Sequence, residues 1–280
     1  MINTTRAQLY RMFHERKLLI FLAVLVFPII LAAICAAILL GNETLVSFLT
    51  STSSDISRIV DATSESSMTL PLYGSVFVNG SFVAMVACCY TAMFAAPELS
   101  EKRAGFAKNL LQARGGRLSL ACSHVIAAAV AGALFVLVCI AATALCFGLA
   151  GFPVMPPAFG AFALWALQVW LVTLAYQALT LVLVFITKSE VVSAVFGVLL
   201  GGFAIETALV MAVGAAAALV GPLPTLETIW SFLTEHSLMA QLQLLGHGTV
   251  CSPDAYAIAI VTVIVSAGIG LTVMRRRSLA

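Results

Sequence analysis

The sequence has few charged residues: 9% of its 280 residues are Asp, Glu, Lys or Arg, whereas 62% are hydrophobic. A soluble domain is about half apolar and about a quarter charged, so this composition excludes a soluble globular protein and indicates an integral membrane protein. The chain also lacks the phosphate-loop patterns GxxxxGKS and GxxxxGKT, as well as HExxH and GxSxG. It is therefore predicted to be no enzyme, and it cannot itself be a Walker-type ATPase.

Residues that bind metals or form cross-links are scarce or scattered. The four histidines, His14, His124, His236 and His247, fall in different regions and on different sides of the predicted membrane. Six of the seven cysteines lie in apolar runs, where cysteine behaves as a small hydrophobe. We expect no disulfide and no metal site, and we predict that this chain itself binds no cofactor and no nucleic acid.

Long apolar runs dominate what is present. A membrane-spanning helix needs about 20 apolar residues to cross a hydrocarbon core of about 30 Å. Six segments meet this length, and they predict an all-α protein with a single transmembrane domain, residues 1–280, whose spans cover residues 18–40, 76–96, 118–149, 159–186, 191–220 and 256–274.

The basic residues give this map an orientation. Of the 14 Lys and Arg, 13 fall on one side of the predicted spans, and Arg58 is the exception. Short loops rich in Lys and Arg stay cytoplasmic, so both termini are predicted to be inside. The basic segment Met1–Arg16 favours either a helix lying at the inner membrane surface or an ordinary basic flank.

The segment Ala96–Arg117 is the most basic loop between two spans. Glu98–Ala113 has few helix breakers, its apolar residues share one helical face, and Gly115-Gly116 is a helix-ending pair. The sequence therefore predicts a short cytoplasmic helix between spans two and three. Two interpretations remain open: a solvated turn that rests on the headgroups, or a docking element for a soluble partner.

Glu206 is the one carboxylate near the middle of a predicted span. A charge at that depth costs roughly 2.5–3.5 kcal/mol on insertion scales, so it is a candidate for a substrate path or a subunit seam. Alternatively, it is protonated or satisfied by Gln168, Gln177 or a backbone carbonyl. Nearby small residues permit close helix packing or pairing with another subunit: Gly197, Gly201 and Gly202.

The basic loop carries a specific pattern. Acidic residues are followed by a Gly-Phe pair, a Lys-Asn pair and a Gly-Gly-Arg turn into span three, here Glu98, Glu101, Gly105-Phe106, Lys108-Asn109 and Gly115-Gly116-Arg117. With the six-span topology, this arrangement resembles the permease subunit of ABC exporters of the type 2 class. The Gly-Phe-x-Lys-Asn pattern looks most like bacterial permeases of lantibiotic (antimicrobial peptide) immunity exporters. His124 departs from it, since many relatives carry Lys there.

The resemblance implies a partner and a role for the loop. A separate ABC ATPase subunit would bind ATP and Mg²⁺, and the loop helix would couple that ATPase to the spans. The coupling residues would be Glu98, Leu99, Glu101, Arg103, Phe106, Lys108, Asn109 and Leu110. A second permease copy, or a related permease, would complete an exporter in the bacterial cytoplasmic membrane. It would move an amphipathic substrate, such as a peptide, an antibiotic or a lipid-like molecule.

Two other functions remain open from the sequence. One is a secondary transporter driven by protons, with Glu206 as the carrier, although few other polar residues lie in the spans to bind ions or substrate. The other is a membrane sensor or assembly protein that performs no transport, whose basic loop binds a different partner.

Overall fold

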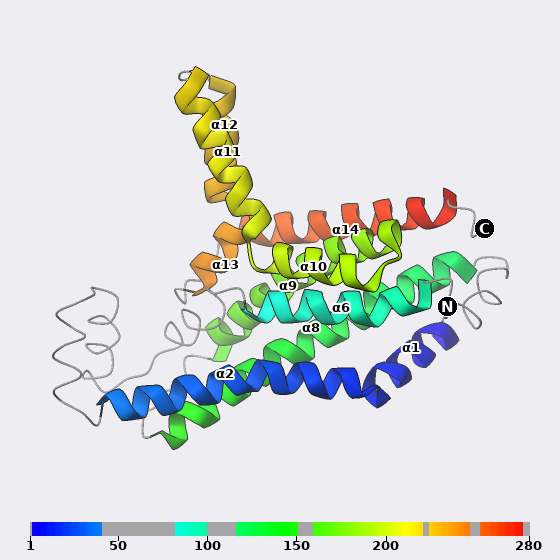
Figure 1. The fold of residues 1–280 in the computed structure, drawn as a ribbon, viewed down its shortest axis with the longest axis vertical. Helices are drawn as coiled ribbons and strands as arrows, with labels where there is room; N and C mark the ends of the chain where they lie inside the picture. Colours follow the sequence, from blue (N-terminus) through cyan, green and yellow to red (C-terminus); the bar gives the residue numbers. More distant parts are fainter. Residues whose placement is uncertain are drawn as a thin grey trace.

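The computed structural model describes residues 2–40, 82–99, 116–150, 159–220, 224–246 and 253–276. Within these ranges all regular structure is α-helical (Figure 1), so the predicted helical class is confirmed. Five helices are long and apolar enough to cross a membrane, and a bent pair of helices makes a sixth crossing if it counts as one span. The chain is a multi-pass membrane protein.

The helices follow one another in a simple order. The first half consists of α1 (Ile2–His14), α2 (Arg16–Leu40), α6 (Phe82–Leu99) and α8 (Gly116–Leu149). The second half consists of α9 (Phe159–Thr187), α10 (Glu190–Gly201), α11 (Ala204–Val220), α12 (Pro224–Glu235), α13 (Leu238–Gly246) and α14 (Pro253–Arg276).

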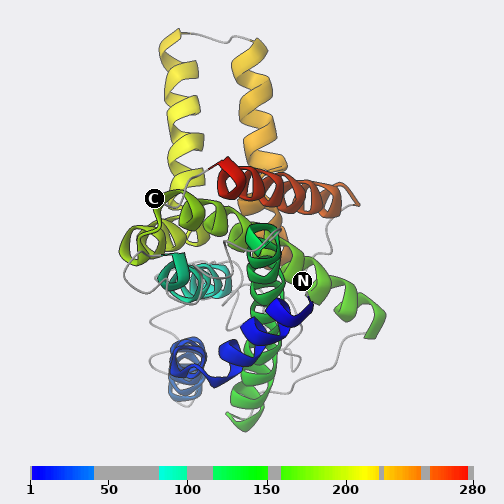
Figure 2. The same ribbon diagram turned by 90° about the vertical axis from the view of Figure 1, so that its right-hand side faces the viewer.

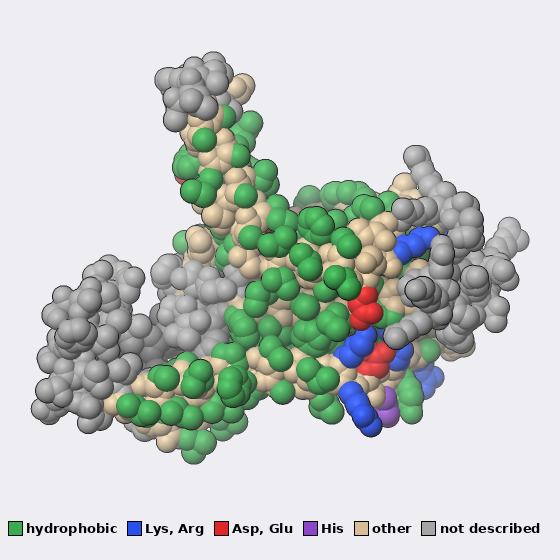
Figure 3. All heavy atoms as spheres, in the orientation of Figure 1, with side chains coloured by type: hydrophobic (Ala, Val, Ile, Leu, Met, Phe, Trp, Pro, Cys, Tyr) green, Lys and Arg blue, Asp and Glu red, His purple; other side chains and the backbone are tan. Residues whose placement is uncertain are grey.

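Polar contacts place several helix termini at one end of the bundle. Lys17 at the start of α2 lies 3.2 Å from Glu190 at the start of α10. Arg117 at the start of α8 donates to the Arg275 carbonyl at the end of α14, at 3.4 Å. Every Lys and Arg of the described ranges belongs to α1 or to a helix terminus or turn at this end, which we call the basic end (Figure 3).

The second predicted span forms the centre of the bundle. In the apolar stretches of α6 and α9, 67% of the residues are buried inside the protein, whereas the same share is 22% in α2 and α14. The ring of Tyr90 on α6 lies 5.7 Å from that of Phe21 on α2 and 5.4 Å from that of Phe135 on α8. These edge-on aromatic contacts join three helices, so α6 determines where its neighbours pack.

Small residues bring α10 close to α6. Ser193, Gly197 and Gly201 recur every four residues on α10 and are buried. A methyl group added at Gly197 would lie 3.2 Å from the Cys88 carbonyl oxygen, and one at Gly201 would lie 2.6 Å from the Met85 Cα. The glycine face predicted from sequence therefore packs against α6 of the same chain, as small residues in membrane helices do.

The predicted fifth span, residues 191–220, is not one straight helix. It divides into α10 and α11, which are bent by 60° relative to each other. The amide of Gly202 bonds back to the Val198 carbonyl at 2.8 Å, and Phe203 has a φ of 63°, which is uncommon for a residue with a side chain. The Gly201-Gly202 pair ends α10, and α11 then leaves the bundle crosswise beside α12 (Figures 1 and 2).

The helix of the second span extends beyond its predicted end at residue 96. The helix α6 continues through Pro97 to Leu99. Residues 76–81 of that predicted span, the predicted outer segment 41–72 and most of the predicted loop helix lie outside the described residues.

Gly201→Ala is expected to destabilise the protein by about 1–3 kcal/mol, because the added methyl group meets the α6 backbone. Gly268→Ala on α14 is the matched control, since nothing lies within 4 Å of the position that its added methyl group would take. The control should be neutral or stabilising by about 0.5–1 kcal/mol, because alanine favours a helix. Thermal unfolding in detergent measures both, and equal midpoints for the two variants would contradict the packing.

Candidate functional site

The structure describes the beginning of the predicted coupling region. Glu98 and Leu99 form the last turn of α6. The other predicted coupling residues lie outside the described residues: Glu101, Arg103, Phe106, Lys108, Asn109 and Leu110. The described part of the coupling region is therefore the end of α6, from which this loop leaves the bundle.

Pro97 leaves a backbone acceptor unpaired within the helix. In an α-helix the carbonyl of Met93 would accept from the amide four residues later, but that residue is Pro97 and has no N–H. The ammonium group of Lys17 replaces this donor and lies 2.7 Å from the Met93 oxygen. The same ammonium group lies 3.2 Å from Glu190, so Lys17 joins α2, α6 and α10.

Arg11 on α1 contacts the same helix end. One guanidinium nitrogen donates to the Phe94 carbonyl at 2.6 Å, and the group lies 4.2 Å above the centre of the Phe94 ring. Its Nε donates to Glu15 at 2.7 Å, and another nitrogen forms an ion pair with Glu98. A planar guanidinium with several donors suits such a multiple contact, which a lysine could not reproduce.

Glu98 is the centre of a largely buried polar cluster. Gln8 on α1 donates to both carboxylate oxygens, at 3.0 and 2.7 Å, beside the ion pair with Arg11. His124 Nε2 on α8 lies 3.1 Å from the second oxygen. Removing one member of a buried charged cluster leaves the others uncompensated, so these groups fix α1, α6 and α8 relative to one another.

Leu99 does not fit its predicted role. The resemblance implies that it is a coupling residue, but it is 4% exposed and belongs to an internal cluster with Leu120, Val184 and Phe185. A short helix end packed against α8 and α9 buries its apolar side chain within its own chain.

The contribution of α1 to this cluster is not predicted from the sequence. Gln8, Arg11 and Glu15 are spaced three and four residues apart, so they lie on one face of a helix. A buried Met12 shares that side. This spacing is a local signal, but Glu98, the partner of Gln8 and Arg11, is more than 80 residues away in the chain, and no local pattern links them.

Glu206 forms a second polar cluster at the break between α10 and α11. Its Oε1 accepts from the Tyr176 hydroxyl on α9 at 2.7 Å, and its Oε2 accepts from the Met239 amide on α13 at 2.9 Å. Of the partners expected from sequence, Gln177 donates instead to Thr91 at 3.0 Å. One carboxylate therefore connects α9, α11 and α13, and it satisfies an amide in the first turn of α13.

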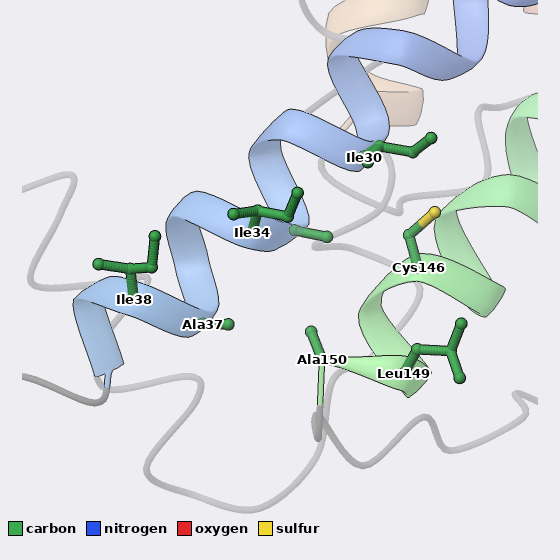
Figure 4. Close-up of a pocket in the computed structure, with 8 residues that line it drawn as sticks. Ile30, Ile34, Ala37, Ile38, Cys146, Leu149 and Ala150 are labelled. Atoms are coloured by element: carbon green, nitrogen blue, oxygen red, sulfur yellow. The ribbon is translucent and has the colours of Figure 1, made fainter.

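The remaining candidates add no further chemistry. The face of Gly197 and Gly201 is covered by α6 of the same chain, whereas Gly202 caps α10 and is exposed. A cleft of about 620 Å³ between α2 and α8 is lined by aliphatic side chains and Cys146 (Figure 4). Among the described residues, no three His, Cys, Asp or Glu side chains are arranged to hold a metal ion.

The sequence matches no protein-family model and no curated protein.

Lys17→Met is expected to destabilise the protein by about 1–3 kcal/mol, because the Met93 carbonyl then lacks a donor in a buried helix. Arg16→Met removes a neighbouring charge from an exposed position and should change the unfolding free energy little. Unfolding in detergent compares the two variants, and equal effects would mean that Lys17 acts only as a surface charge.

Tyr176→Phe is expected to cost about 1.5–3 kcal/mol, because it removes a hydrogen bond to a carboxylate. Tyr10→Phe, at a tyrosine that is 67% exposed, is the matched control and should be near neutral. The same unfolding assay measures both. A loss for Tyr176→Phe no larger than that of the control would contradict the role of Glu206 as a link between helices.

Proposed function

We propose that this chain is the membrane subunit of an ATP-driven exporter whose ATPase is a separate protein. The observation that carries the proposal is the anchored start of the basic loop. The loop that resembles a coupling element begins at Glu98, which contacts Gln8, Arg11 and His124. A helix that receives force from a partner needs such a rigid attachment, because a freely moving loop would not transmit the motion.

The basic end is proposed to face the cytoplasm. Positive residues near spans are retained on that side, and the described Lys and Arg gather there. On this orientation α1 lies at the inner membrane surface, where its exposed Tyr10 and Phe13 contact lipid and its basic residues contact headgroups. The membrane is proposed to be the bacterial cytoplasmic membrane.

The contacts at the basic end give a route for coupling. Lys17 joins the end of α6 to Glu190 at the start of α10, and Arg11 joins α6 to α1. A displacement of the loop would therefore move α1, α2, α6 and α10 together. The distal end of α10 is the break beside Glu206, so motion at the basic end would reach the other half of the bundle.

Transport by this class requires two membrane subunits, so a second copy or a related permease is part of the proposal. The substrate is proposed to be amphipathic, since the bundle offers few polar groups within the spans. Glu206, which is hydrogen-bonded to Tyr176, is proposed to lie near the substrate path. The proton-driven alternative would instead make Glu206 the carrier.

Purification of the full-length protein from native membranes in mild detergent tests the proposal. We expect a phosphate-loop ATPase to co-purify, and Phe106→Asp with Leu110→Asp should abolish its recovery while leaving membrane insertion intact. The matched control is Tyr10→Asp with Phe13→Asp, two exposed apolar residues on α1 at the same end.

Recovery of the ATPase with both double variants would contradict the coupling role of the loop. Recovery of the chain alone, together with proton-dependent transport that is lost in Glu206→Gln, would replace the proposal by the secondary-transport alternative.

A further inference from the structure

The helices α11 and α12 form a hairpin that projects from the bundle, and we call these two helices, Ala204–Val220 and Pro224–Glu235, the arm. Figures 1 and 2 show the arm leaving the side of the bundle crosswise to the long helices. Its two helices pack on each other, since a methyl group added at Gly214 would lie 2.6 Å from Trp230. The function proposed above does not explain this element.

The course of the chain keeps α10 from completing a span by itself. The 12 residues of α10 give a length of about 18 Å at 1.5 Å per residue, which is shorter than a hydrocarbon core of about 30 Å. The 60° bend then turns α11 away from the direction of α10. The arm therefore begins just past the middle of the bilayer and extends obliquely into the half that is remote from the basic end (Figure 1).

The break is compatible with a lipid environment because its polar groups have partners. The amides of Gly202 and Phe203 bond to the carbonyls of Val198 and Leu200, at 2.8 and 3.1 Å. The Glu206 carboxylate accepts from Tyr176 and from the Met239 amide. Irregular backbone at membrane depth is tolerated only when its groups are satisfied in this way.

The side chains of the arm match the boundary between hydrocarbon and headgroups. From Ala208 to Ala217, α11 has only apolar residues and glycine, and Met211 is 69% exposed. By helical spacing, α12 has one polar face, formed by Glu227, Thr228, Ser231, Thr234 and Glu235, and one apolar face with Ile229 and Trp230. An apolar helix beside an amphipathic one fits lipid tails on one side and headgroups on the other.

The charge of the arm indicates which leaflet it contacts. The arm contains Glu206, Glu227 and Glu235 and has no Lys or Arg. The anionic cytoplasmic leaflet attracts basic segments, and these lie at the basic end instead. Trp230 on α12 is of the residue type that concentrates at membrane interfaces.

We propose that the arm docks on phospholipids of the leaflet opposite the basic end, with the apolar face of α12 and the exposed side of α11 in contact with acyl chains. The apolar faces of the arm are thus covered by lipid and not by a second copy of the chain. This proposal rests on the orientation of the basic end proposed above but not on an ATPase partner, so it stands or falls separately from the ATPase partnership.

Tryptophan quenching in vesicles tests the proposal. The full-length protein carries Trp230→Phe in all samples, and single tryptophans are then added by Ile229→Trp on the apolar face or Ser231→Trp on the polar face. Both positions are exposed, so the variants form a matched pair. The probes are phosphatidylcholine brominated on its acyl chains and aqueous iodide on both sides of the membrane. Emission from the Trp230→Phe background is subtracted.

The expected result is a bromolipid-to-iodide quenching ratio for Ile229→Trp that is several times the ratio for Ser231→Trp. Strong iodide quenching of both tryptophans would place the arm in water and overturn the proposal. Protection of Ile229→Trp from both quenchers, with loss of that protection when the protein is diluted to monomers, would show that a second copy covers the face, and this also overturns it.

Discussion

The packing of the helices at the basic end depends on one missing backbone hydrogen-bond donor. Pro97 lies in the last turn of the largely buried helix α6, and it leaves the Met93 carbonyl without its helical partner. An unpaired carbonyl in a buried position costs free energy, so another group must supply the donor. Lys17 supplies it, and Arg11 binds the next carbonyl along the helix. These two cations place α1 and the start of α2 against α6, beside the carboxylate of Glu98.

The part of the bundle remote from the basic end also contains an irregular helix end beside a charged side chain. The Gly201-Gly202 pair stops α10 in the middle of an apolar segment, and Glu206 then accepts from an amide and a hydroxyl of neighbouring helices. At the basic end the charged side chains come from another part of the sequence, whereas Glu206 lies just after the break and links the start of α11 to α9 and α13. The two places lie at the two ends of α10, because Glu190 contacts Lys17 and Gly201 packs on Met85. A movement of α10 would therefore affect both.

Much of the helical pattern could be predicted because runs of about 20 apolar residues and the positions of Lys and Arg are local signals. The break at Gly202 was not predicted, since a glycine pair in an apolar run also fits close packing, and Gly197 and Gly201 do pack closely on α6. Glu206 was identified as a candidate from its charge alone, but its partners Tyr176 and Met239 are distant in sequence. For the same reason the contact between Glu98 and α1 could not be read from Ala96–Arg117, and Leu99 was assigned to a partner although it is buried.

A double-mutant cycle between Glu98→Gln and Arg11→Met tests most directly the claim that α1 is fixed to the origin of the basic loop by a charged cluster. The unfolding free energies of the wild type, both single variants and the double variant are measured in the same detergent. The account predicts a coupling energy of about 1–3 kcal/mol, as for groups that share one charged network. Effects that add to within about 0.5 kcal/mol would show that the two side chains do not interact, and would contradict the account.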